Sequence, residues 1–287
     1  MSSPRLSFVL PVYNPDLKLL ARVVKALCDQ SFKDWEALWV IDGPNEGAAD
    51  VIRAGMKKKA NHYRVVEQEH SGAQRARNHG TSLSRGEFVV CFDSDCLIEP
   101  DTAQTWVDQF DKNPDIGFVY SGYKFLDEKG AIAGEPFDPW TLRIRNYISA
   151  CFPVRREFAG TWNESLKSLQ DWSFWLSVVE KGGKGKFLPG FAFSTAYPEG
   201  KSISAEGCTD TVWLERVDAV KKLHNLPERD ICVSSLRSKH EGVFLAKILD
   251  ADYQDYPNWK PHKYTPIIQI GFCFLPHAVE AHTGIFS

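Results

Sequence analysis

Two carboxylates separated by one residue follow a short apolar run in the chain. Asp93 and Asp95, with Ser94 between them, come directly after Val89-Val90-Cys91-Phe92. Oxygen atoms at this spacing can reach one hard divalent cation, which in proteins commonly bridges to phosphate groups. The alternative is a solvated acidic turn, because such triplets occur in many loops. The triplet is therefore a candidate site for a metal ion and a diphosphate, and its position in the fold decides between the two interpretations.

A third carboxylate, Asp42, stands before Gly43-Pro44-Asn45, a sequence typical of a turn. One interpretation is an Asx-turn, in which the side chain bonds to its own backbone. The other is a hydrogen-bond acceptor for a nucleotide base. The local sequence around Asp42 does not decide between these two interpretations.

A basic segment runs from Gly72 to Gly80 and carries Arg75 and Arg77 on the first turns of a predicted helix. Backbone N–H groups at a helix start and nearby guanidinium groups both favour phosphate. The alternative is a basic helix face paired with the glutamates that precede it, Glu67 and Glu69. His79 in the same segment is interpreted as structural.

Four apolar runs in the first hundred residues alternate with helical patterns. The first ends at Tyr13-Asn14-Pro15, where Asn14 suits an N-cap and Pro15 the first helical position. Such alternation predicts a parallel sheet with helices on both faces, and ligands then bind at the carboxyl ends of the strands. We expect strands at 6–12, 36–41, 63–66 and 87–92, and helices at 17–27, 46–60 and 73–83.

The rest of the chain is less regular. A strand is expected at 116–125, turning into a hairpin through 127–130, and the strand–helix rhythm is lost beyond about 205. A helical C-terminal extension is therefore expected there. Helices are expected at 100–110, 170–180 and 211–224.

Composition sets limits on the class of protein. The 287 residues carry a net charge of −3, with 43% hydrophobic and 25% charged residues, which argues against disorder and against nucleic acid as the main partner. No targeting segment and no apolar stretch of transmembrane length is visible, so we expect a cytoplasmic protein, with peripheral membrane contact left open. The seven cysteines form no CxxC pair, which favours reduced thiols and argues against a zinc site.

Five segments resemble, in order and spacing, the blocks of a family 2 glycosyltransferase of the GT-A fold. This fold is an α/β architecture with a Rossmann-like nucleotide-binding sheet and an acceptor-binding half. The resemblance covers about residues 5–205 and implies a transferase domain at 1–205, with a donor half at 1–98, an acceptor half at 99–205 and an extension at 206–287. The segments read SFVLPVYN, VIDGPNEG, SGAQRARNHG, GEFVVCFDSDCLIEPD and LQDWSFWL.

The resemblance also implies roles for individual residues. A carboxylate partly buried among aromatic residues, as Asp171 is in the fifth segment, has a raised pKa that suits a base. The alternative for Asp171 is an N-cap or first-turn aspartate favoured by the helix dipole. The implied roles are the nucleotide pocket for Pro11, Tyr13 and Asn14, the base contact for Asp42, a nucleotide contact for Arg75 or Arg77, the metal and sugar diphosphate for Asp93, Ser94 and Asp95 with Asp95 the direct ligand, a phosphate contact for Lys201, and the catalytic base for Asp171.

The implied reaction is inverting transfer from a nucleotide-diphosphate sugar, a UDP-sugar by preference, with Mn²⁺ or Mg²⁺. The acceptor would be a saccharide, a lipid-linked glycan or a protein, and the C-terminal extension could support an oligomer. Lack of a QxxRW motif and of a membrane helix favours single addition over processive synthesis. Aromatic residues of the second half form either a sugar platform or part of the core: Trp140, Trp162, Trp172 and Trp175.

Two other functions remain open. A sugar-nucleotide pyrophosphorylase would share the sheet and the acidic site, but it should carry a Gly-rich, Arg-containing loop where this chain has PVYNPD. A non-catalytic nucleotide-sugar-binding protein is supported by Gln170, which stands where the family usually has Glu.

Overall fold

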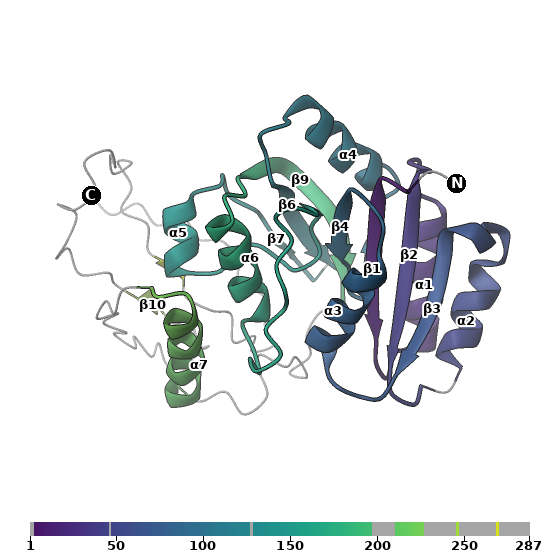
Figure 1. The fold of residues 1–287 in the computed structure, drawn as a ribbon, viewed down its shortest axis with the longest axis horizontal. Coiled ribbons are helices and arrows are strands. Elements are labelled where there is room, and N and C mark those ends of the chain that lie inside the picture. The colour runs from purple at the N-terminus through teal and green to yellow at the C-terminus, as the bar shows by residue number, and fades with distance from the viewer. Residues whose placement is uncertain are drawn as a thin grey trace. The chain divides into compact units, whose positions relative to one another are not determined.

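The chain forms two compact units, residues 1–197 and 198–287, in a computed structural model (Figure 1). The first unit holds a nine-stranded sheet. The predicted donor and acceptor halves, 1–98 and 99–205, stay predictions. The structure describes residues 3–45, 47–126, 129–196, 210–226, 245–246 and 268–269.

The first part of the sheet is the predicted alternation of parallel strands and helices. Strands β3, β2, β1 and β4 lie in that order, and all neighbouring pairs are parallel. Because right-handed crossovers run from β1 to β3 in one direction and then return to β4, helices α1 and α2 lie on one face and α3 on the other (Figure 1). The elements are β1 (Leu6–Val12), α1 (Leu17–Cys28), β2 (Trp35–Asp42), α2 (Ala48–Gly55), a 3₁₀ segment η1 (Lys57–His62), β3 (Tyr63–Gln68), α3 (Ala73–Leu83) and β4 (Phe88–Cys91).

The start of α1 differs from the prediction. Asp16, rather than Asn14, is the N-cap, and its carboxylate accepts hydrogen bonds from the backbone N–H groups of Lys18 and Leu19. Asn14 instead adopts a φ of +43° and donates its backbone N–H to the side chain of Asn45. Asn tolerates this left-handed conformation, so the chain turns sharply at the end of β1.

The second part of the sheet is mixed rather than parallel. Strand β8 pairs antiparallel with β4 and joins it to β6, and the long strand β9 runs parallel to β6 and antiparallel to β5. Strand β9 was not predicted because Pro189 and Gly190 interrupt its pattern, and β5 and β8 were not predicted because they are very short. The elements are β5 (Cys96–Ile98), α4 (Thr102–Lys112), β6 (Phe118–Phe125), β7 (Ala131–Ile132), α5 (Pro139–Ile144), β8 (Val154–Arg155), α6 (Gln170–Glu180) and β9 (Gly185–Thr195).

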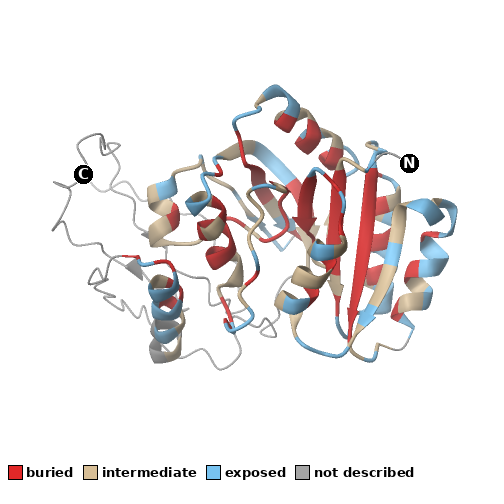
Figure 2. Cartoon of the chain, in the orientation of Figure 1, coloured by how far each residue is buried: buried red, intermediate tan, exposed pale blue. Residues whose placement is uncertain are grey.

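Burial explains why the central strands are almost entirely apolar. All eight residues of β2 are buried, and burial is concentrated along β1, β2 and β4 (Figure 2). A sheet covered on both faces leaves no solvent-facing side, so its strands lose the alternation of polar and apolar residues. The predicted hairpin is present, since Tyr123 of β6 pairs with Ile132 of β7.

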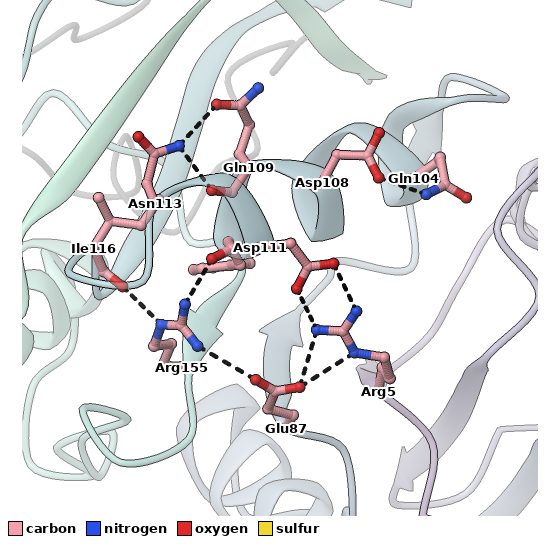
Figure 3. A network of polar contacts seen from close by, with 10 residues as sticks. Arg5, Glu87, Gln104, Asp108, Gln109, Asp111, Asn113, Ile116 and Arg155 are labelled. Carbon is pink, nitrogen blue, oxygen red and sulfur yellow. Dashed lines mark hydrogen bonds and ion pairs between the residues drawn. The ribbon is translucent and has the colours of Figure 1, made fainter.

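A network of charges ties the start of β1 to α4 and to the ends of β4 and β8 (Figure 3). The guanidinium group of Arg5 lies 3.1 Å from Glu87 and 2.7 Å from Asp111. Arg155 reaches Glu87 from the other side at 3.3 Å and donates to the carbonyl oxygen of Phe110. These contacts join segments that lie from 45 to 106 residues apart in sequence.

The second unit contains helix α7 (Asp210–Leu223), which confirms the predicted helix to within one residue at each end. Two short strands, β10 (Leu245–Ala246) and β11 (Ile268–Gln269), pair antiparallel. In the portion of the chain that the structure describes, no helix is both long and apolar enough to cross a membrane.

Candidate functional site

The predicted polar residues converge at the carboxyl ends of three adjacent strands. Tyr13 follows β1, Asp42 ends β2, and Asp93 follows β4. Because β1 lies between β2 and β4, these residues surround the point where the strand order reverses. Open α/β sheets bind ligands at this switch point.

Asp42 is almost inaccessible, with 1% of its surface exposed, and anchors the segment after β3. Its carboxylate accepts hydrogen bonds from the side chain of Gln68 at 2.8 Å and the backbone N–H groups of Ser71 and Gly72 at 2.8 and 2.9 Å. His70 Nδ1 lies 3.0 Å away as a fourth partner. Burial alone would raise the pKa of Asp42, but these partners outweigh it and the pKa is lowered.

Tyr13 offers an exposed aromatic face beside this anchor. Its ring stacks on the ring of His70 at a centroid distance of 4.1 Å, and 57% of Tyr13 is exposed. Pro11 lies within β1, in register with Val40, and does not project from the strand end as Tyr13 and Asn14 do. The stack marks where a flat ligand could meet the protein.

Arg77 and Arg75, which the sequence left as equal candidates, have different surroundings. The side chain of Arg77 is 11% exposed and donates a 2.7 Å hydrogen bond to Asp93, whereas Arg75 is exposed at the start of α3. The predicted alternative of a basic face paired with Glu67 or Glu69 is not what Arg77 forms. Burial opposes the charge of Arg77, but Asp93 holds its pKa above the usual range.

Arg77 also begins a stack of side chains that leads to helix α6. Its guanidinium group lies 4.6 Å from the ring centroid of Trp162, and Trp162 stacks on Phe174 of α6 at 4.3 Å. Asn78 positions Trp162 by donating to its carbonyl oxygen and accepting from its backbone N–H, at 2.9 and 2.8 Å. This role of Asn78 was not predicted, because Asn78 and Trp162 are 84 residues apart in sequence.

The three residues of the acidic triplet form a turn between β4 and β5. Ser94 is half-buried at this turn, and Asp95 keeps an exposed surface. Desolvation by the surrounding protein, together with the negative charge of Asp93, raises the pKa of Asp95 to about 6. Two carboxylates in one turn suit a divalent cation bound through oxygen atoms.

Asp171 lies in the first turn of α6 but is not its N-cap, which is Leu169 with a φ of +58°. A left-handed leucine costs about 1–2 kcal/mol, and such strain is common at functional sites. Burial raises the pKa of Asp171, although the backbone N–H of Trp172, the charge of Arg77 and the side chain of Asn146 lower it in part. The negative charge of Asp171 also acts on Tyr123 of β6, whose pKa rises mainly through burial.

Other predicted residues do not join this cluster. Trp162, Trp172 and Trp175 are no more than 2% exposed, so they belong to the core and cannot act as a sugar platform. His79 bonds to the side chain of Gln68, in agreement with its interpretation as structural. Lys201 lies outside the described residues.

The sequence profile of glycosyl transferase family 2 matches residues 7–179. This chain belongs to glycosyl transferase family 2. The chain is 28% identical over 190 residues to chondroitin synthase of Escherichia coli. This match covers 62% of the chain and 27% of the relative. The chain thus spans about a quarter of that relative's length.

Solved structures show that the fold of this family 2 chain is the GT-A fold. Residues 1–349 of S. aureus TarS in complex with UDP-GlcNAc superpose with a TM-score of 0.62 at 18% identity, covering 76% of this chain and 66% of that one. The mannosyltransferase PcManGT of Pyrobaculum calidifontis, in complex with GDP-Man and Mn²⁺, gives a TM-score of 0.56 at 18% identity, covering 71% and 60%. The mixed sheet matches the expected fold class.

Proposed function

We propose that this chain is a metal-dependent, inverting glycosyltransferase that moves a sugar from a UDP-sugar to an acceptor hydroxyl. One observation carries the proposal: a single buried guanidinium group, that of Arg77, acts on both the acidic triplet and the residue that would be the base. It bonds to Asp93 and its charge lowers the pKa of Asp171. The proposed donor site and the proposed base therefore both lie near the guanidinium group of Arg77.

Asp171 acts as the general base. The acceptor oxygen attacks the anomeric carbon as the bond from that carbon to the diphosphate oxygen breaks, and the electron pair leaves on the phosphate. The acceptor proton passes to Asp171, whose raised pKa makes it a stronger base than an ordinary aspartate. Attack from the face opposite the leaving group inverts the anomeric configuration.

Asp93 and Asp95 would hold Mn²⁺ or Mg²⁺, the hard ions that carboxylate oxygens prefer. Such a cation stabilises the negative charge that develops on the departing diphosphate. The raised pKa of Asp95 supports this assignment, because desolvation and the charge of Asp93 both disfavour its negative charge and a bound cation would offset them. The manganese in the PcManGT complex supports it from a protein of the same fold.

The nucleotide would occupy the pocket formed by Pro11, Tyr13 and Asn14, with its base on Tyr13. Asp42 already has four hydrogen-bond partners, so a nucleotide base that bonds to Asp42 must replace one of them. That partner is His70, because its side chain is 51% accessible. Arg75 is exposed at the start of α3, where its charge suits the diphosphate. Ser94 and Lys201 would contribute further phosphate contacts. The TarS complex with UDP-GlcNAc supports uridine as the nucleoside.

The acceptor would be a saccharide, a lipid-linked glycan or a protein hydroxyl in polysaccharide biosynthesis, a class that the relative named chondroitin synthase supports. The transfer would take place in the cytoplasm, with nucleic acid playing no part. Residues 206–287 would provide any contact with a second subunit or a membrane surface.

The testing experiment is a thermal-shift panel with UDP, GDP, CDP and their common sugar conjugates, each with Mn²⁺, Mg²⁺ or EDTA. A ligand that binds the native state raises its stability by mass action. We expect a shift for UDP and one UDP-sugar that EDTA abolishes. A shift for another nucleotide overturns the uridine assignment, and an undiminished shift in EDTA overturns the metal assignment. Absence of any shift overturns the donor site.

A further inference from the structure

Two buried thiols lie directly beside the acidic triplet. Cys96 begins β5 and Cys151 precedes β8, and their sulfur atoms are 3.8 Å apart. Cys151 also accepts a hydrogen bond from the backbone N–H of Asp93 at 3.4 Å. The ligand atoms of Asp93, Cys96 and Cys151 all lie within 4.8 Å of one another.

We propose that Asp93, Cys96 and Cys151 bind a thiophilic divalent cation, with Zn²⁺ as the physiological candidate. Zinc–sulfur bonds of about 2.3 Å at the tetrahedral angle place two sulfur atoms about 3.8 Å apart. The observed sulfur separation equals this value, whereas a disulfide would need about 2.05 Å. Three protein ligands leave the fourth position open to water or to a phosphate oxygen.

The charges at this site balance when Zn²⁺ is bound. Two thiolates and the Asp93 carboxylate carry three negative charges, and Zn²⁺ with the adjacent guanidinium group of Arg77 carries three positive charges. Each thiol gives up its proton as the ion binds.

The site is reached from the side of Asp93, whose side chain is 37% exposed, while both cysteines are at most 2% exposed. This proposal departs from the expectation that the cysteines hold no metal, which rested on the lack of a CxxC pair. The fold brings together two cysteines 55 residues apart.

Zinc at this site would compete with the cation proposed for Asp93 and Asp95. A soft ion held by two sulfur atoms takes Asp93 away from an ion that needs oxygen ligands. Zn²⁺ would then inhibit transfer supported by Mn²⁺. This consequence rests on the proposed function, whereas the zinc site itself does not.

The test is titration of the metal-free full chain with Co²⁺, followed by absorption spectroscopy. We expect one Co²⁺ with thiolate-to-cobalt charge-transfer bands and the intense ligand-field bands of tetrahedral geometry, all bleached by one equivalent of Zn²⁺. Losing groups that merely support a ligand costs about 10- to 100-fold in metal affinity, so Cys96→Ser or Cys151→Ser should cost more than about 100-fold. Cys28→Ser, which removes a thiol bonded to Gly55 and Met56, is the matched control and should leave the bands unchanged.

Two results would overturn the zinc site. One is a wild-type Co²⁺ spectrum without charge-transfer bands, which would leave a hydrogen-bonded thiol pair as the explanation. The other is persistence of the bands in Cys96→Ala/Cys151→Ala. Should the variants fail to fold, X-ray absorption of the zinc-loaded wild type decides, since two sulfur neighbours support the site and none refutes it. All of these readings are independent of transferase activity.

Discussion

The guanidinium group of Arg77 and the carboxylate of Asp93 are joined by a 2.7 Å hydrogen bond. Arg77 comes from α3 and Asp93 from the turn after β4, so the bond fixes two of the family's sequence segments against each other. The same guanidinium group lies over Trp162, which connects it to α6. Arg77 is therefore a positioning residue at the centre of the site.

Replacing Arg77 with Gln should move the acid limb of the pH–rate profile to higher pH. The positive charge of Arg77 lowers the pKa of Asp171, so its loss raises that pKa. Loss of a charged hydrogen bond of about 1.5–3 kcal/mol should also reduce turnover by about tenfold or more. Arg77→Lys keeps the positive charge, so the acid limb of its pH–rate profile should stay at the wild-type pH. An unchanged limb in Arg77→Gln would contradict the electrostatic role.

Asp171→Asn should abolish transfer without weakening donor binding. General-base catalysis contributes about 10²- to 10⁴-fold, which sets the expected loss of turnover. Asp115→Asn, at an exposed site, is the control. Turnover by the wild type that disappears in Asp171→Asn would also exclude a non-catalytic nucleotide-sugar-binding protein. Equal turnover in both variants would remove Asp171 from the mechanism.

The same substitution should stabilise the fold at neutral pH. A carboxyl group whose pKa is raised on folding favours the native state below its unfolded pKa, and this contribution is lost as the pH rises through the folded pKa. At pH 7 the buried charge is therefore unfavourable, and the neutral amide removes it. Thermal unfolding at pH 7 should show a higher Tm for Asp171→Asn, and a lower Tm would show that Asp171 is more stabilising than its burial indicates.

Asp42→Asn should destabilise the protein by about 2–3 kcal/mol, because the amide leaves buried donors without an acceptor. The lowered pKa of Asp42 gives the opposite pH dependence to that of Asp171. Its contribution is present above the unfolded pKa and lost as the pH falls through the folded pKa. Urea unfolding at pH 7 and in acid should show the difference between wild type and variant shrinking on acidification. A pH-independent difference would contradict this account.

The charge network of Figure 3 should contribute modestly. A double-mutant cycle of Arg5→Met and Asp111→Asn should give a coupling energy of about 0.2–1 kcal/mol, since both side chains are partly exposed. The coupling should fall in high salt, because screening weakens exposed pairs. A coupling that is insensitive to salt would indicate a packing effect instead.

The sequence by itself predicted the parallel strands and most of the helices, and it placed the acidic triplet at a strand end. Helices α3 and α6 occupy the predicted residues, because the signals that define a helix are local: its apolar periodicity and the residues at its ends. The carboxyl ends of β1, β2 and β4 could be placed at one edge of the sheet, because strands connected through helices run parallel and so end on the same side. The positions of Asp42 and Asp93 followed directly.

Only the tertiary structure decided which partners those residues meet. It placed Arg77 rather than Arg75 on Asp93, buried Trp162 against Phe174, and brought Cys96 to Cys151. These contacts join segments distant in sequence, and they form because side chains from different elements must fill one packed interior. No local pattern carries that information, so the sequence predicted which residues form the candidate site but not which of them are in contact.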